Sequence, residues 1–114
     1  MHKKAGKKHP GLKGRVLKLI DLVRHRAGAI VSREILRGRS GSVTLFAFDR
    51  GQGLSEHTTP FDAMVMILEG TALITISGRR MRIRKGETVI MPAGKPHALK
   101  ALGRFKMLLT MIKK

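Results

Sequence analysis

The sequence predicts an all-β protein built as a small jelly-roll barrel. From residue 30 onward the chain consists of eight short runs of β-forming residues, and glycine-containing breaks separate most of them. In addition, 114 residues are enough to bury a hydrophobic core without disulfides. We therefore expect one domain around one core.

The expected strands follow one another closely, with turn residues at their ends. Turn-forming residues separate successive runs, at Glu69-Gly70, Ser77-Gly78 and Lys85-Gly86. The expected strands span residues 30–36, 42–48, 63–68, 72–76, 81–84, 88–91, 97–102 and 105–112. Before them, residues 16–23 fit either a helical turn or an extra edge strand lying over the domain.

The run Met81–Arg84 alternates strictly between apolar residues and arginines. In a strand this alternation sends the two kinds of side chain to opposite faces. We interpret the arginines as the solvent face of an edge strand, where charge also blocks edge-to-edge aggregation. A dedicated anion site is the alternative.

The chain is strongly basic, with 24 Lys and Arg against 7 Asp and Glu and a formal net charge of +17. Such an excess attracts polyanions. Trp and Tyr are absent, so the base-stacking surface of a sequence-specific module is missing, and we expect at most weak, non-specific nucleic-acid binding. Residues 1–14 offer little to bury and are expected to form a basic flexible tail before a domain of residues 15–114. His2, His9 and His25 lie in basic segments and are expected to be solvated.

The composition excludes several classes of site. Without cysteine there can be no disulfide, thiolate metal site or cysteine nucleophile, so a bound metal must use imidazole or oxygen ligands. The sequence has no apolar stretch long enough for a membrane helix or a signal peptide, and we expect a cytoplasmic protein that does not bind membranes.

A stiff turn precedes His97. Pro92 fixes its own φ, Gly94 permits a positive φ, and Pro96 keeps the preceding residue extended, so the backbone leading into the histidine has few alternatives. Such a turn can aim one imidazole into the interior.

These residues resemble a motif of the cupin superfamily. The spacing of Gly86, Pro92, Gly94 and His97 is that of the second cupin motif, although Ala101 replaces its trailing Asn. The first motif matches at Gly51, His57 and Gly70, but has Thr59 in place of its second His and Ala63 in place of its Glu. The resemblance covers residues 42–112 and implies a double-stranded β-helix.

In that family three histidines and a glutamate bind iron, manganese, nickel, zinc or copper inside the barrel, and only His57 and His97 match here. A third ligand would have to come from Asp62, if a bulge turns it inward, or from the Thr59 hydroxyl. Thr59, Ala63 and Met107 are expected to line the pocket.

Three functions remain open at this point. The chain could be a metalloprotein or enzyme with a metal on two histidines, a metal-free module that binds a small molecule in the same pocket, or a basic nucleic-acid-associated protein. The sequence assigns no catalytic residue. The family resemblance also implies a homodimer.

Overall fold

The computed structural model describes residues 11–114, so the expected tail lies mostly outside the described residues. The described chain forms a 3-10 turn, η2 (Leu19–Asp21), and nine strands. The strands are β1 (Ile30–Gly38), β2 (Gly41–Phe48), β3 (Gly53–His57), β4 (Phe61–Glu69), β5 (Thr71–Ile76), β6 (Arg79–Arg84), β7 (Thr88–Met91), β8 (His97–Lys100) and β9 (Phe105–Lys113). No described helix is long and apolar enough to cross a membrane.

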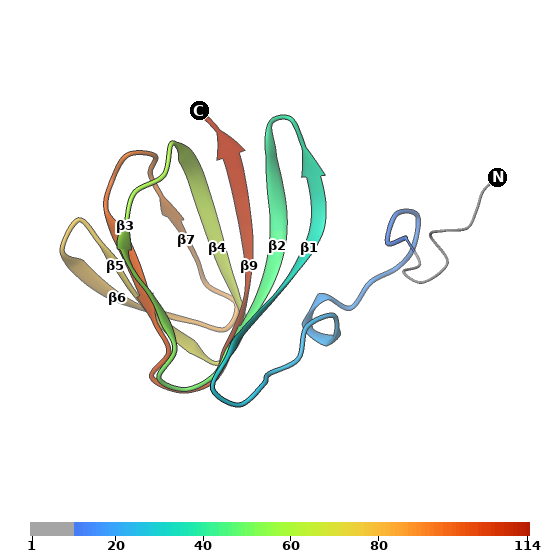
Figure 1. The fold of residues 1–114 in the computed structure, drawn as a ribbon, viewed down its shortest axis with the longest axis horizontal. Helices are drawn as coiled ribbons and strands as arrows, with labels where there is room; N and C mark the ends of the chain where they lie inside the picture. The colour runs from blue at the N-terminus through green and yellow to red at the C-terminus, as the bar shows by residue number, and fades with distance from the viewer. Residues whose placement is uncertain (1–10) are drawn as a thin grey trace.

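The strands form two antiparallel sheets that face each other, as Figure 1 shows. The order is β1-β2-β9-β4-β7 in one sheet and β3-β8-β5-β6 in the other. Because strands distant in sequence lie side by side, as β2 and β9 do, the fold is the expected jelly roll. All eight expected strands are present. Strand β7 has the expected bounds, the other seven differ at one or both ends, and β3 is an additional strand that was not expected.

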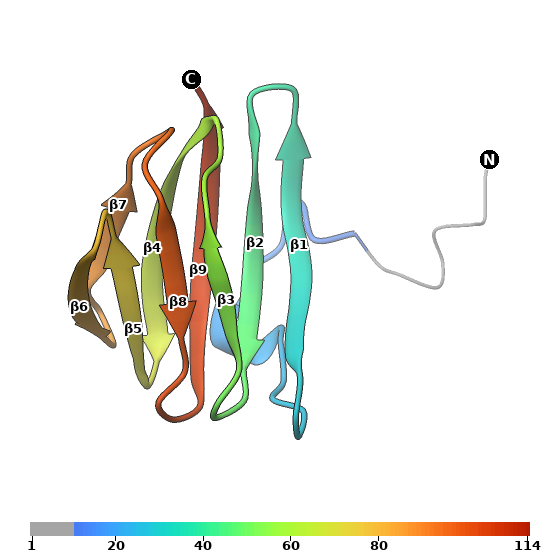
Figure 2. The ribbon, with the colours of Figure 1, turned by 60° about the vertical axis from the view of Figure 1, so that its left-hand side comes forward.

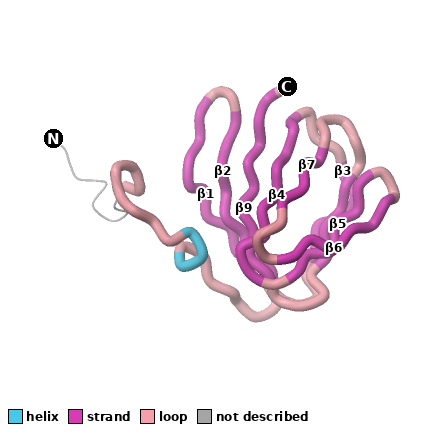
Figure 3. The backbone as a smooth tube through the Cα atoms, turned by 180° about the vertical axis from the view of Figure 1, so that it is seen from behind, coloured by secondary structure: helices cyan, strands magenta, loops and turns pink. Residues whose placement is uncertain are grey.

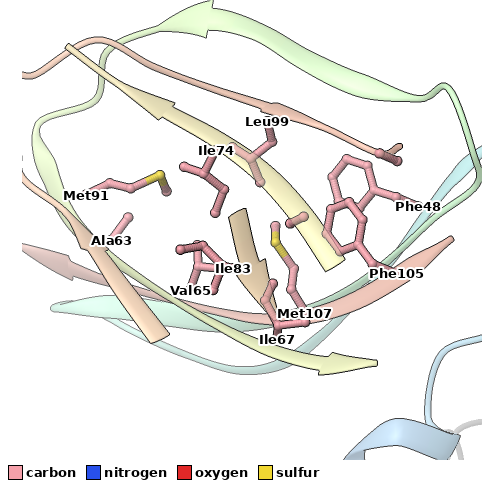
Figure 4. Packing of buried hydrophobic residues seen from close by; sticks show 12 residues of the cluster. Phe48, Ala63, Val65, Ile67, Ile74, Ile83, Met91, Leu99, Phe105 and Met107 are labelled. Carbon is pink, nitrogen blue, oxygen red and sulfur yellow. The ribbon is translucent and has the colours of Figure 1, made fainter. Parts of the chain in front are cut away.

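The main core fills the space between the sheets. Phe48 and Phe105 are fully buried, and their rings stack with centroids 4.5 Å apart. Figure 4 shows this pair at one end of the cluster and Ala63 and Met91 at the other. The aromatic pair therefore closes one end of the barrel, and smaller or more flexible side chains occupy the other.

A second, smaller cluster lies outside the barrel, so the expectation of one core was incomplete. Residues 19–25, here called the N-terminal strap, run along the outer side of the five-stranded sheet (Figure 3). Val23 of the strap is only 3% exposed and belongs to a cluster with Leu45 and Ala47 of β2. Of the two readings of residues 16–23, the helical turn over the domain is the one observed, because η2 lies within this segment.

Polar contacts hold the strap against the sheet. The Lys106 ammonium donates to the Ile20 carbonyl at 2.7 Å, and His25 Nε2 lies 2.8 Å from Glu69 Oε2. The expectation that His25 is solvated was wrong, because its side chain is 12% exposed and faces the Glu69 carboxylate of β4. His2 and His9 lie outside the described residues.

Asp49 ties three segments together near the start of the barrel. Its carboxylate accepts hydrogen bonds from the Gly28 N–H at 2.6 Å and from Arg104 Nε at 2.9 Å. These bonds, with a further one from the Arg50 N–H, lower the pKa of Asp49 to about 2. The turn before β1 is thereby fixed to the loops that follow β2 and β8.

Candidate functional site

A small cavity lies between the two sheets, at the end of the core that carries Ala63 and Met91 (Figure 4). Its volume is about 60 Å³. The lining residues are Leu54, His57, Thr59, Ala63, Met91, His97, Leu99, Met107, Leu109 and Met111. Only three of them are polar, so this cavity, here called the barrel pocket, is an apolar chamber with two imidazoles and one hydroxyl.

The two histidines reach the barrel pocket from neighbouring strands. His97 begins β8 directly after the proline-glycine turn and is only 3% exposed. His57 ends β3 and is exposed, and the register between β3 and β8 shifts between Leu54 and His57. This irregularity pairs His57 with His97, and their ring centroids lie 4.3 Å apart.

Each imidazole is anchored through the same ring nitrogen. His57 Nδ1 lies 2.7 Å from the Ser55 carbonyl oxygen, and His97 Nδ1 lies 3.2 Å from the Lys95 carbonyl oxygen. A carbonyl oxygen can only accept a hydrogen bond, so both Nδ1 atoms carry a proton. In the neutral rings each Nε2 atom is therefore left as an acceptor with a free lone pair.

Burial is the main cause that lowers the pKa of His97 below its ordinary value. The Lys95 carbonyl opposes this shift, and the neighbouring His57 adds to it. The lowered pKa favours the neutral ring of His97 near pH 7. The deeper of the two imidazoles is therefore a hydrogen-bond acceptor under ordinary conditions.

Two hydrogen bonds connect the segments that carry the histidines. The Ala93 N–H donates to Asp62 Oδ1 at 2.9 Å, and the Gly94 N–H donates to the Thr59 carbonyl at 2.8 Å. Gly94 adopts a φ of 78°, a left-handed conformation that glycine tolerates best. The turn before His97 is thus fastened to the start of β4.

Asp62 does not join the two histidines. A bulge would be needed to turn Asp62 inward, but β4 pairs regularly with β9 around Asp62, and the irregularity of β4 lies between Ile67 and Glu69. Since neighbouring residues of a strand face opposite sides, Ala63 lines the barrel pocket while Asp62 caps the turn at Ala93. Within residues 11–114 no three His, Cys, Asp or Glu side chains form a group that could hold a metal ion.

The other expected residues lie at the barrel pocket. Thr59, Ala63 and Met107 all line it, and the Thr59 hydroxyl accepts a hydrogen bond from the Phe61 N–H at 2.9 Å. The pocket is also lined by five residues that were not expected there, namely Leu54, Met91, Leu99, Leu109 and Met111. Strand alternation could have found some of them, because Leu99 lies two residues after His97, and Leu109 and Met111 lie two and four residues after Met107.

Comparison with known proteins agrees with this architecture. A solved structure of a conserved protein of unknown function from Streptococcus pyogenes is 40% identical, with a TM-score of 0.84 and 89% of each chain covered. A cupin superfamily protein from Desulfitobacterium hafniense is 29% identical, with a TM-score of 0.85, covering 91% of this chain and 95% of that one.

An uncharacterized protein of Streptomyces coelicolor is 33% identical over 64 residues, and the match spans 56% of this chain and 61% of that protein. The family model described as the cupin domain matches residues 44–113, the region that contains both histidines and eight of the nine strands wholly or largely. With the two opposed sheets, this match shows that the chain belongs to the cupin family.

Proposed function

We propose that the chain binds a small molecule in the barrel pocket, with His57 and His97 at the polar end of the site. The observation that supports this most is the shared anchoring of the two rings through Nδ1. It leaves the Nε2 atoms of two rings, whose centroids lie 4.3 Å apart, free to accept hydrogen bonds beside a wall that is apolar except for Thr59. Pockets of this composition orient a ligand by a few polar groups and bind it largely by apolar contact.

The size of the barrel pocket limits what it can hold. A water molecule takes up about 30 Å³ in the liquid, so 60 Å³ corresponds to roughly two waters. A ligand would place only a few heavy atoms inside and extend past the exposed His57 toward solvent. The flexible side chains of Met91, Met107 and Met111 could enlarge the space by changing rotamer.

The hydrogen-bond polarity of the site narrows the ligand class further. In a neutral imidazole the free Nε2 accepts a hydrogen bond, so ligands with hydroxyl, amine or amide groups suit the site in this form and a bare carboxylate does not. A carboxylic acid could bind only together with a proton. We assign no reaction to the site, and the proposal is one of binding.

A divalent transition metal is the second candidate. Histidines that ligate metals commonly donate their other ring N–H to a carbonyl, and His57 and His97 both do so. The ligands present here do not, however, match the family's set of three histidines and a glutamate. Only the two histidines remain, because the Asp62 carboxylate accepts a hydrogen bond from Ala93 instead. Transition-metal sites usually provide at least three protein ligands, so we expect weak metal affinity here.

The test compares three variants of the untagged, metal-depleted protein. A panel of small alcohols, phenols, amides and carboxylic acids is screened by thermal shift, and hits are followed by the ¹⁵N shifts of the histidine rings. His57→Gln and His97→Gln should each abolish binding, whereas Asp62→Asn, whose amide oxygen can still accept from Ala93, should preserve it. Unchanged binding by both histidine variants would refute the proposal.

The metal candidate has its own test. Zinc or cobalt content is measured after equal loading of the wild type and of Thr59→His/Ala63→Glu, which restores the two family ligands. The double variant should take up more metal. A double variant that folds normally and takes up none would eliminate the metal candidate and leave the metal-free pocket.

A further inference from the structure

The outer face of the four-stranded sheet carries a regular row of cations. Arg80, Arg82 and Arg84 of β6 are all exposed, while Met81 and Ile83 between them turn toward the core. β6 is an edge strand, as the sequence analysis expected. Figure 2 shows β3, β8, β5 and β6 from this side, with no other part of the described chain lying over them.

The strand register places this row beside a neutral strip. Arg82 pairs with Leu73, which in turn pairs with Lys100 of β8. In the next row, Arg80 pairs with Thr75, which pairs with Ala98. We call these residues the arginine face, with cations on β6 and at Lys100 and small or uncharged side chains between them.

The neutral strip is hollowed. A depression of about 260 Å³ lies along it and over the neighbouring β3, with its floor and rim formed by Gly51, Gly53, Leu54, Ser55, Leu73, Thr75, Ala98, Leu99 and Lys100. Gly53 approaches β8 so closely that a Cβ atom there would lie 2.5 Å from the Leu99 carbonyl oxygen. The hollow is therefore a product of small residues in close-packed strands.

The arginine face carries charge of one sign. Strands β5, β6 and β8 contain no Asp or Glu, and the one carboxylate on the strands of this sheet is the exposed Glu56 of β3, at the opposite edge from β6. The ion pairs found within residues 11–114 join His25 to Glu69, Arg37 to Glu34 and Arg104 to Asp49, and none of these residues belongs to β5, β6 or β8. The Glu87 carboxylate, three residues after the end of β6, accepts a hydrogen bond from the Arg84 backbone N–H.

The spacing of the arginines suits a repeating anion. Alternate residues of an antiparallel strand rise by about 6.8 Å, so the three guanidinium groups project from the sheet at regular intervals along a line. This interval is comparable to the distance between successive phosphates of an extended nucleic-acid strand. Guanidinium groups also bind phosphate oxygens in a bidentate manner.

We propose that the arginine face binds the phosphodiester backbone of single-stranded nucleic acid without reading its sequence. A flat sheet would touch a cylindrical duplex only along a narrow line, whereas an extended strand can follow the arginine row and rest its sugars and bases in the hollow over Leu73 and Ala98. No Trp or Tyr exists to stack on bases, which removes the main source of base preference. This binding is independent of the barrel pocket, which opens on the inner side of the same sheet.

The experiment measures binding of fluorescein-labelled 20-nucleotide single strands of mixed sequence, as DNA and as RNA, by anisotropy at 50–200 mM salt. Each phosphate contact with a single strand contributes about 0.7 to the magnitude of the slope of log K against log salt. The triple variant Arg80→Thr/Arg82→Thr/Arg84→Thr removes three such contacts. It should therefore lower the magnitude of the slope by about 2 and the affinity at 50 mM salt by roughly 100-fold. Threonine suits a strand, and circular dichroism melting verifies the fold of the variant. The matched control, Arg24→Thr/Arg26→Thr/Arg39→Thr, removes three exposed arginines outside the face and should change affinity less than about threefold.

Several outcomes would overturn the proposal. Equal losses in the two triple variants would mean that net charge alone attracts the strand. If polyglutamate displaces the probe as effectively as unlabelled single strands do, the face binds polyanions in general. If a duplex binds more tightly than a single strand at equal phosphate concentration, single-stranded nucleic acid is not the preferred ligand. Should the first variant fail to fold, amide shift mapping on the wild type decides, because shifts must concentrate in residues 71–84 and 98–100.

Discussion

Filling the barrel pocket provides the sharpest test of whether it is free space that the fold holds open. Ala63 is 2% exposed and lines the pocket, so Ala63→Val would place two additional carbon atoms in a volume of about 60 Å³. Removing a cavity of that volume is worth about 1.4 kcal/mol at 24 cal/mol per Å³. The transfer of two methylene-sized groups from water gives a similar figure, about 1.6 kcal/mol.

We therefore expect Ala63→Val to raise the free energy of unfolding by up to about 1.4 kcal/mol and the melting temperature by roughly 5–10 °C. Thermal unfolding followed by circular dichroism measures the change. The matched control is Ala72→Val, because Ala72 is fully buried in the same core but does not line the barrel pocket. Overpacking there should destabilise the protein by about 1–3 kcal/mol.

The comparison has two ways to fail. If Ala63→Val lowers the melting temperature as much as Ala72→Val does, the space beside His97 is not available to another group. If Ala63→Val is stabilised but still binds the small molecules that the wild type binds, the ligand lies elsewhere. A stabilised variant without binding would mean that the protein keeps an open cavity at the expense of stability, as functional sites often do.

Three further predictions concern the fold. Gly70→Ala should destabilise by about 2 kcal/mol or more in a denaturant titration, because Gly70 has a φ of 75° and a Cβ atom there would lie 2.3 Å from the Arg104 carbonyl oxygen; a neutral effect would contradict this geometry. The pKa of His97 is lower in the folded chain than its ordinary value of 6.5, so its neutral form contributes fully to the free energy of unfolding above pH 6.5. This contribution should decline as the pH falls below 6.5. In His97→Gln, the free energy of unfolding should depend less on pH in that range. Deleting residues 1–13 should leave the melting temperature nearly unchanged, whereas deleting residues 1–25 removes the strap and should lower stability by at least about 3 kcal/mol; equal effects of the two deletions would show that the strap contributes nothing.

Alternation and turn residues were enough to predict most of the fold. Strand β6 was read correctly because its apolar and charged residues alternate from Arg80 to Arg84. Strand β3 was missed because, in the run Gly53–His57, Leu54 is the only strongly apolar residue. That strand is held by pairing with β8, a long-range contact that a local pattern does not record.

In the candidate site, too, some features could be predicted from the sequence pattern and others depended on how the strands pair. The convergence of His57 and His97 could be anticipated because they occupy matching positions of the two motifs, whereas the direction of Asp62 depended on where the strands bulge. The bulge lies in β3 rather than at the start of β4, and a shift of one residue decides which face a side chain takes. The strap was similarly ambiguous, since Leu19, Leu22 and Val23 reveal an apolar segment but not the sheet that it covers. The homodimer rests on the family resemblance and stays a prediction.

The hydrogen bonds from Ala93 to Asp62 and from Gly94 to Thr59 have a thermodynamic consequence for any occupant of the barrel pocket. They fix the turn before His97 with the protein's own groups, so the chain does not need a ligand to order it. Binding should therefore carry little conformational entropy cost and little coupled folding, unlike small metal domains that fold only when the metal binds. Calorimetry should give a small heat-capacity change, set by the few atoms that enter the pocket, and the circular dichroism spectrum should be the same with and without the ligand.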